Sequence, residues 1–169
     1  TEVTGRDEKQ LKLTLWEPGD FKFTTLAGEV KEVNGVTEKA VELKSPWNVE
    51  FAPEKGEKTL IGLDKLVLWN EHTNPAIKYF SGTATYRNTF SLTGEQASMP
   101  ARLQLGEVFN VARVWVNGED MGILWTSPWR VQLTGKLKEG ENELKVEVVN
   151  CWANRLIGDA GLPKEKRTT

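Results

Sequence analysis

The chain has 169 residues, and its 22 Lys and Arg residues against 24 Asp and Glu residues give a formal net charge of −2. This length predicts one domain, or one domain with an N-terminal extension. A net charge near zero gives no support for binding to nucleic acid or to a membrane surface. No apolar run approaches the roughly 18 residues of a membrane span, and the charged first ten residues do not form a signal peptide.

Alternating apolar and polar residues predict strands in the N-terminal part of the chain. Residues 1–10 are polar and are expected to be frayed. Leu11–Trp16 and Asp20–Leu26 are predicted to form a hairpin through the Pro-Gly turn between them. Further strands are predicted at Glu29–Val33, before the hairpin-turn signal Asn34-Gly35, and at Ala40–Lys44 and Trp47–Phe51.

The middle of the chain contains one long β-rich run, Ser81–Leu92, which places Tyr86 and Phe90 on one face and Arg87 on the other. Before it, Leu60–Trp69 fits either one helical turn or a short irregular strand. After it, a loop at Thr93–Pro100 and a strand at Arg102–Leu105 are predicted.

A hairpin follows, in which Val114 and Val116 share one face and Arg113 and Trp115 the other. Asn117-Gly118 provides the two positive-φ residues that a type I′ turn requires. The second arm is Met121–Trp125. Pro128 removes a backbone donor, so Thr126–Trp129 is predicted to leave the sheet as a loop.

The C-terminal part adds predicted strands at Trp129–Leu133 and Glu143–Val149 and a single helical turn at Asn154–Asp159. About ten short strands without a long amphipathic helix indicate an all-β sandwich or barrel. The predicted core consists of Tyr86, Phe90, Leu103, Leu105, Val114, Val116, Leu144, Val146 and Val148.

The seven tryptophans divide into two groups. Trp16, Trp47 and Trp69 are expected to pack in the core or across a hairpin, and Trp115 in the core or between the sheets. Trp125, Trp129 and Trp152 lie in loops at strand ends, where structural packing and ligand contact are equally favoured.

No constellation for catalysis or metal binding is evident in the sequence. The single histidine, His72, lies in a polar loop, and there is no Gly-rich phosphate loop, Cys cluster or Gly-x-Ser-x-Gly elbow. A glycosidase needs two carboxylates flanking one cleft, and no such pair can be assigned. Asp159, four residues after Arg155, is interpreted first as part of a structural ion pair and second as a ligand-binding group.

Several motifs in the second half resemble a known module. They include Ala112-Arg-Val-Trp-Val-Asn-Gly with Gly122, Trp125-x-x-Pro-x-Arg-Val, Gly140-Glu-Asn and Asn154-Arg-Leu-Ile-Gly-Asp159, preceded by Tyr79-Phe-Ser-Gly-Thr-Ala-Thr-Tyr. Over about residues 47–166 the chain resembles the galactose-binding-like jelly roll of large bacterial glycoside hydrolases. It is especially similar to the C-terminal module of family 106, the α-L-rhamnosidase-like enzymes, and it is related to the sugar-binding domain of family 2.

The resemblance implies a jelly-roll module at residues 46–169, preceded at residues 1–45 by extra strands or the end of another domain. It implies that the catalytic acid and base lie in a separate domain. In family 2 relatives the loop after the hairpin can reach that domain's active site; the matching residues are Trp125, Thr126, Ser127 and Trp129. Family 2 β-galactosidases carry an acidic residue there, whereas this chain has Thr126-Ser127.

The expected function is therefore that of a non-catalytic, carbohydrate-binding or accessory module of a glycoside hydrolase. A second hypothesis is an interaction domain that supports a catalytic domain without binding sugar, and a free-standing hydrolase is the least favoured. The expected contact residues are Trp125, Thr126, Ser127, Trp129, Asn150, Trp152, Asn154, Arg155 and Asp159. The expected partner is carbohydrate or the catalytic domain of the same parent chain, and the resemblance implies a periplasmic or secreted location. No cofactor is expected, and nothing in the sequence supports a structural calcium ion.

Overall fold

A computed structural model describes residues 2–6, 11–16, 18–35, 40–44, 46–53 and 57–168. The chain divides into two compact units, Thr1–Glu42 and Leu43–Thr169. Antiparallel strands dominate both units. Within the described part of the chain, no helix is long and apolar enough to cross a membrane.

The first unit contains two separate antiparallel pairs. β1 (Glu2–Arg6) pairs with β2 (Leu11–Thr14), and β3 (Gly19–Thr24) pairs with β4 (Val30–Gly35). The predicted hairpin between β2 and β3 is therefore wrong, because each strand pairs with its other neighbour in sequence. The expectation of a frayed N-terminus is also wrong at β1, whose backbone is used in pairing.

The turn of the β3–β4 hairpin lies at residues 25–28, where the Gly28 N–H donates to the Thr25 carbonyl at 3.0 Å and Gly28 has a φ of 86°. The Asn34-Gly35 signal instead falls within β4, opposite Asp20 and Gly19. An Asn-Gly dipeptide permits a turn but does not require one. Here Asn34 and Gly35 both have a partner on the neighbouring strand, so the chain stays extended.

The predicted strand at residues 40–44 is absent; this segment is irregular. Leu43 packs against the hydrophobic core. The Asn88 Nδ2 atom donates to the carbonyls of Lys44 and Pro46 at 3.0 and 3.2 Å. A buried side-chain amide thus satisfies backbone groups of this segment that a neighbouring strand would otherwise pair.

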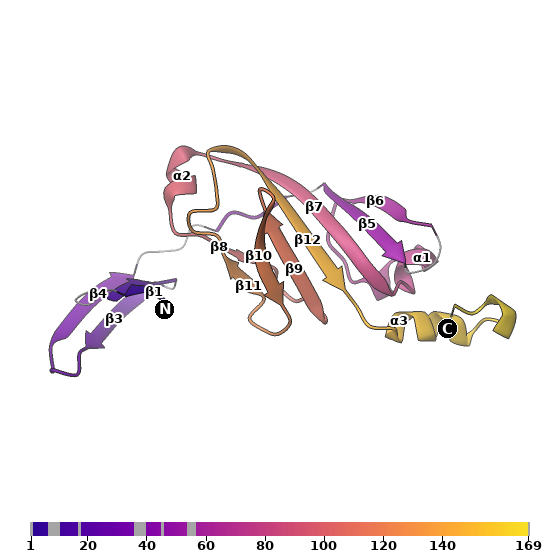
Figure 1. The fold of residues 1–169 in the computed structure, drawn as a ribbon, viewed down its shortest axis with the longest axis horizontal. Helices are drawn as coiled ribbons and strands as arrows, with labels where there is room; N and C mark the ends of the chain where they lie inside the picture. Colours follow the sequence, from indigo (N-terminus) through magenta and orange to yellow (C-terminus); the bar gives the residue numbers. More distant parts are fainter. Residues whose placement is uncertain are drawn as a thin grey trace. The chain divides into compact units, whose positions relative to one another are not determined.

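The second unit is built on a six-stranded antiparallel sheet with the order β10-β9-β12-β7-β5-β6 (Figure 1). Its strands are β5 (Trp47–Pro53), β6 (Thr59–Leu63), β7 (Gly82–Leu92), β9 (Val111–Val116), β10 (Glu119–Leu124) and β12 (Gly140–Val149). β7 and β12, with 11 and 10 residues, are the longest and pair along their whole length.

A second, two-stranded sheet pairs β8 (Arg102–Gln104) with β11 (Arg130–Gln132). Leu103 and Val131 of this sheet pack against the core that the six-stranded sheet buries. The apolar faces of the two sheets therefore enclose one core, which makes the unit the β-sandwich that the strand pattern predicts.

The second unit also contains short helices, three between strands and two after the last strand. They are η1 (Trp69–Glu71), α1 (Pro75–Lys78), α2 (Gly94–Ser98), α3 (Ala153–Ala160) and η2 (Lys164–Lys166). The ambiguous Leu60–Trp69 run thus contains a strand, β6, and reaches a 3₁₀ turn at Trp69. α2 lies in a region predicted as a loop; Thr93 and Gln96 form a reciprocal capping box at its start, which satisfies backbone donors that its short length leaves free.

All nine predicted core residues lie in the core or pack against it. Val114, Val116, Leu144 and Val146 are almost fully buried. Trp115 is the exception among the tryptophans predicted to be packed inside the fold. It lies on the opposite, outer face of the sheet, because strand alternation gives the core face to Val114 and Val116.

The hairpin between β9 and β10 has the predicted geometry, with φ values of 52° at Asn117 and 80° at Gly118. The Asn117 side chain donates to Asn142 Oδ1 at 2.9 Å, and Asn142 is fully buried. Asn142 in turn donates to the carbonyls of Lys138 and Gly140 and accepts the Lys138 N–H. The Val-Asn-Gly and Gly-Glu-Asn motifs are thus two halves of one buried amide network.

Candidate functional site

The two segments predicted to form a contact site reach the same end of the six-stranded sheet. In the register, Leu124 of β10 and Val148 of β12 both pair with Ala112 of β9. β10 and β12 therefore run parallel, one strand apart, with ends about 10 Å from each other. We call the segments that follow them, Trp125–Trp129 and Asn150–Ile157, the sheet-end surface.

Large apolar side chains of the sheet-end surface are open to solvent. Trp125 is 73% exposed and Trp152 47% exposed, whereas Trp129 is half-buried. Leu156 and Ile157 of α3 are 55% and 66% exposed. Because two of the three indoles are accessible, both a ligand and a protein partner could contact this surface.

The loop of residues 125–129 is held by backbone hydrogen bonds at its C-terminal end. The Trp129 carbonyl accepts the Leu105 N–H at 2.9 Å, and the Pro128 carbonyl accepts the Arg130 N–H at 2.8 Å. The Ser127–Pro128 peptide bond is cis. Thr126 and Ser127 are exposed, so their hydroxyls are available to a partner.

The two asparagines predicted in this site differ in what they contact. The Asn150 side chain accepts the Gly82 N–H at 3.0 Å and donates to the Phe80 carbonyl at 2.9 Å. Asn150 therefore holds the beginning of β7 next to the end of β12, and both its amide oxygen and its amide nitrogen already have a backbone partner. Asn154, half-buried at the start of α3, lines a neighbouring groove, to which Asn150 also contributes.

Arg155 and Asp159 form the expected i,i+4 ion pair, with Arg155 Nη2 and Asp159 Oδ1 2.5 Å apart. The Asp159 side chain is only 3% exposed, and its Oδ2 accepts the Thr168 N–H at 2.8 Å. The pair therefore links α3 to the C-terminal segment. Gly158 of the same helix approaches Tyr79 so closely that a Cβ at position 158 would lie 2.7 Å from Tyr79 Cβ.

A groove of about 430 Å³ lies beside the sheet-end surface, on the core face of the sheet. Its walls come from β5, β7 and β12, from the first residues of the sheet-end segment after β12, and from two loops, 66–70 and 105–110, that the sequence did not mark as functional. The lining is mainly apolar, with Phe109 60% exposed. Asn70, Asn110 and Glu107 place polar groups on it. The run Leu66-Val-Leu-Trp69 was the available signal, because three consecutive aliphatic residues outside a strand are unusual for a solvated loop.

Among the described residues there is no group of three or more His, Cys, Asp or Glu side chains that could hold a metal ion. The carboxylate Asp120 has its pKa held below the usual value by hydrogen bonds from Arg113 and from the Gly122 N–H. His72 is half-buried, and its Nδ1 accepts the Asn74 N–H at 3.0 Å just before α1. These contacts stabilise turns and strands. Among the described residues that line the groove, Glu107 is the single carboxylate.

Two antiparallel sheets that enclose one core define the class of the second unit: an all-β sandwich of the jelly-roll type. Residues 62–163 match the family described as glycosyl hydrolase 2 galactose-binding domain-like. The chain belongs to this family.

Relatives agree with that assignment. The chain is 39% identical over 150 residues to a protein of Formosa agariphila named provisionally as a beta-glucuronidase. Among solved structures, the rhamnosidase from Novosphingobium sp. PP1Y matches 94% of the chain at 31% identity with a TM-score of 0.67. A Ruminococcus gnavus beta-glucuronidase matches 64% of the chain at 18% identity with a TM-score of 0.54, which shows a shared fold.

The chain is short compared with these relatives. It spans 13% of the Formosa protein, 14% of the Novosphingobium rhamnosidase chain and 20% of the Ruminococcus chain. Each match therefore concerns one module of a much larger protein.

Proposed function

We propose that this chain is a non-catalytic accessory module of a larger glycoside hydrolase and that its sheet-end surface packs against the catalytic part of that enzyme. The observation that carries the proposal is the exposure of large apolar side chains from separate segments, Trp125, Trp152, Leu156 and Ile157, at one end of the sheet. Large apolar side chains that gather at one end of a fold and stay exposed are a common mark of a surface that a partner covers.

The composition of the sheet-end surface favours a protein partner over a sugar. A sugar site needs polar groups that are free to hydrogen bond with the ligand's hydroxyls. Here the amide of Asn150 is already hydrogen bonded within the module. Aromatic side chains such as those of Trp125 and Trp152 are enriched in the central residues of protein interfaces.

Carbohydrate binding at the same end is the second candidate, and one observation favours it. The exposed indole of Trp125 is followed directly by the exposed hydroxyls of Thr126 and Ser127. An aromatic face beside hydroxyl groups is suited to stacking and hydrogen bonding with a sugar ring.

The family relationship also supports a periplasmic or secreted location, as part of this proposal.

Reconstitution tests the proposal. The 169-residue chain is mixed with the parent enzyme from which this segment has been deleted, and association is measured by calorimetry. Ile157→Lys and Trp125→Ser are each expected to weaken association by about tenfold or more, the usual effect of removing a central apolar side chain. Leu60→Lys is the matched control, because Leu60 is also apolar and 73% exposed but lies on β6, outside the sheet-end surface.

Two results would contradict the proposal. One is no association of the wild-type chain with the remainder of the enzyme. The other is saturable binding of galactose, rhamnose or uronic-acid oligosaccharides, followed by Trp fluorescence, that is lost in Trp125→Ser while association with the enzyme is unchanged. The second result would establish the carbohydrate-binding candidate instead.

A further inference from the structure

The six-stranded sheet has two edges, β6 on one side and β10 on the other (Figure 1). Among the described residues, β5 is the one strand that pairs with β6. In an antiparallel pair, the N–H and C=O groups of alternate residues point away from the partner strand. The outer backbone groups of β6 therefore lie at an open edge of the sheet, to which a further strand can be added.

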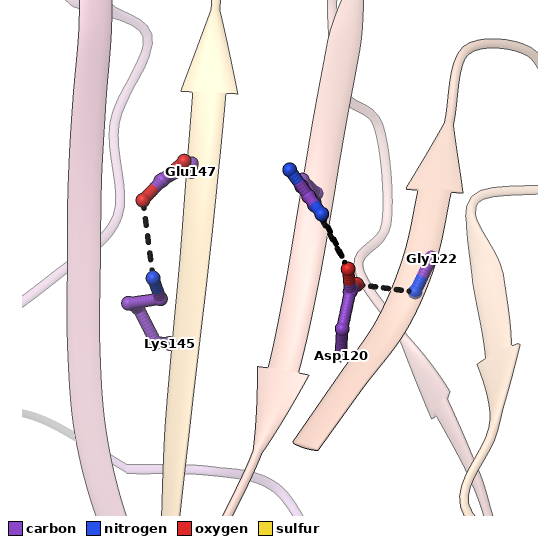
Figure 2. Close-up of polar contacts among 5 residues, drawn as sticks. Asp120, Gly122, Lys145 and Glu147 are labelled. Atoms are coloured by element: carbon purple, nitrogen blue, oxygen red, sulfur yellow. Dashed lines mark hydrogen bonds and ion pairs between the residues drawn. The ribbon is translucent and has the colours of Figure 1, made fainter. Parts of the chain in front are cut away.

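The β10 edge has the features by which proteins prevent such strand addition. It begins with the acidic residues Glu119 and Asp120, and a bulge between Asp120 and Gly122 interrupts its pairing with β9. The Asp120 carboxylate fixes this bulge by accepting the Gly122 N–H at 2.9 Å (Figure 2). Charges and bulges of this kind keep an edge strand from pairing with another chain.

The β6 edge lacks all of these features. Its sequence, Thr59-Leu-Ile-Gly-Leu63, contains no charged residue and no proline, and its register with β5 is continuous. Ile61 and Leu63 pack against the core, so strand alternation places Leu60 on the outer face of the sheet, where it is 73% exposed. An apolar edge strand of this kind is a template for pairing with another strand.

The shape of β6 is complementary to itself when two copies run antiparallel. With a two-fold axis at Ile61, Leu60 of one copy lies opposite Gly62 of the other. The backbone of Gly62 is not in the left-handed region, and a Cβ at position 62 would meet no atom within 4 Å. The fold of one copy therefore does not require glycine there, whereas the open space above Gly62 can hold Leu60 of a second copy.

The charges next to β6 match under the same axis. Lys58 of each copy lies opposite Asp64 of the other, and one position further out Glu57 lies opposite Lys65. All four residues are exposed. Within one copy, Lys58 Nζ also contacts Glu50 Oε1 at 2.7 Å, so Lys58 is placed between two carboxylates. Opposite charges in facing positions stabilise a pair of strands.

We propose that β6 pairs antiparallel with β6 of a second copy of this chain, about a two-fold axis at Ile61, and so joins two sheets into one. A two-fold interface requires a surface that is complementary to itself. The matches in shape and in charge both meet this requirement, and they favour a second copy over a strand of unrelated sequence. An edge of five residues buries less area than a standard interface of roughly 1,200–2,000 Å², so we expect a weak dimer with a Kd of about 0.1 mM.

Analytical ultracentrifugation of the 169-residue chain over a range of concentrations tests the proposal, and a monomer–dimer equilibrium is expected. Leu60→Lys should weaken dimerisation by about tenfold or more, because it places a charge from each copy close to the axis. Ile123→Lys is the matched control. Ile123 is also apolar and 57% exposed, but it lies on β10, the other edge strand.

Exchange of the charges tests the register. Lys58→Glu and Asp64→Lys should each weaken dimerisation by about tenfold, because each places like charges opposite each other. The variant with both substitutions restores opposite charges and should recover most of the wild-type affinity. Circular dichroism and the melting temperature of each variant separate an effect on pairing from an effect on folding.

Three results would overturn the inference: a wild-type chain that stays monomeric, dimerisation that Leu60→Lys leaves unchanged, or a double charge variant that dimerises no better than the single ones. The first would assign the β6 edge to a strand of the larger enzyme. The second, together with loss of dimerisation in Ile157→Lys, would assign self-association to the sheet-end surface. Because β6 is not part of that surface, association with the rest of the enzyme can succeed or fail independently of these measurements.

Discussion

At the scale of single residues, Asn142 explains why the Val-Asn-Gly and Gly-Glu-Asn motifs occur together. Its fully buried amide contacts Asn117, Lys138 and Gly140 through four hydrogen bonds. The two motifs resemble those of a known family, and their physical role in this chain is to join two turns. This role could not be derived from the sequence, because it depends on a pairing between residues 25 positions apart.

Asn142→Ala is expected to destabilise the fold by about 2–4 kcal/mol, because it leaves buried backbone groups and the Asn117 amide without partners. Chemical denaturation of wild type and variant measures the difference. Asn48→Ala is the control, since Asn48 is exposed on β5, and exposed substitutions usually change stability by less than about 0.5 kcal/mol. An equal effect of the two substitutions would contradict the role given to the buried network.

Asp120 gives a prediction about pH. Its pKa is lowered by the hydrogen bonds from Arg113 and Gly122, so it should titrate below its usual value near 3.8. The Arg113–Asp120 pair contributes to stability above the carboxyl's unfolded pKa, and the contribution is lost as the pH falls through the lowered folded pKa. NMR titration should show the pKa rising in Arg113→Met. An unchanged pKa would show that Arg113 is not its cause.

The side of the sheet on which Trp115 lies could have been predicted from the alternation of apolar residues in its strand. Alternation with Val114 and Val116 places it on the outer face, whereas a position in the core or between the sheets was expected for it. The structure resolves this conflict by covering the ring with Lys145 and Arg113. A long cationic side chain can shield an aromatic surface while its charged group stays in contact with water.

At the scale of elements, the strands predicted best are those whose two faces differ most, β7, β9 and β12. The strand pairing of the first unit could not be predicted in the same way, because its turn residues permit more than one hairpin. α2 was missed although Thr93 and Gln96 have capping-box spacing, since five residues are too few for a helical period. The groove beside the sheet end brings together loops that only the tertiary fold makes neighbours.

Gly158 fixes the position of α3. Alanine favours a helix over glycine by about 1 kcal/mol, but a Cβ at position 158 would lie 2.7 Å from Tyr79 Cβ, an atom fixed next to its backbone. Gly158→Ala is therefore expected to lower the melting temperature, with a cost of about 1–3 kcal/mol from overpacking. Gly161→Ala is the control, because nothing lies within 4 Å of a Cβ there. Equal stability of the two variants would contradict the docking of α3 through Gly158.

Asp159→Ala tests the ion pair of the same helix. Removing the buried carboxylate leaves Arg155 without its partner, and breaking a buried pair commonly costs about 3–5 kcal/mol; the partial exposure of Arg155 reduces this, so about 2 kcal/mol is expected. Thermal denaturation measures it. Glu165→Ala, an exposed carboxylate in η2, provides the control. An unchanged melting temperature together with lost ligand binding would favour a ligand-binding role for Asp159.

At the scale of the whole molecule, the chain is expected to have no glycosidase activity alone. Glycoside cleavage needs a proton-donating acid and a second carboxylate in one cleft, and the groove contains a single carboxylate, Glu107, among its lining residues. Incubation of the purified chain with aryl glycosides is the measurement. Turnover that disappears on changing one carboxylate would contradict this prediction.

The central claim is that the sheet-end surface is covered in the larger enzyme. Hydrogen exchange compares the 169-residue chain with the same residues in the intact parent enzyme. The account predicts slower exchange in the parent for peptides from Trp125–Trp129 and Asn150–Ile157, with unchanged exchange in β5, whose backbone is paired on both sides by β6 and β7. Equal exchange of both sheet-end segments in the two forms would contradict the claim.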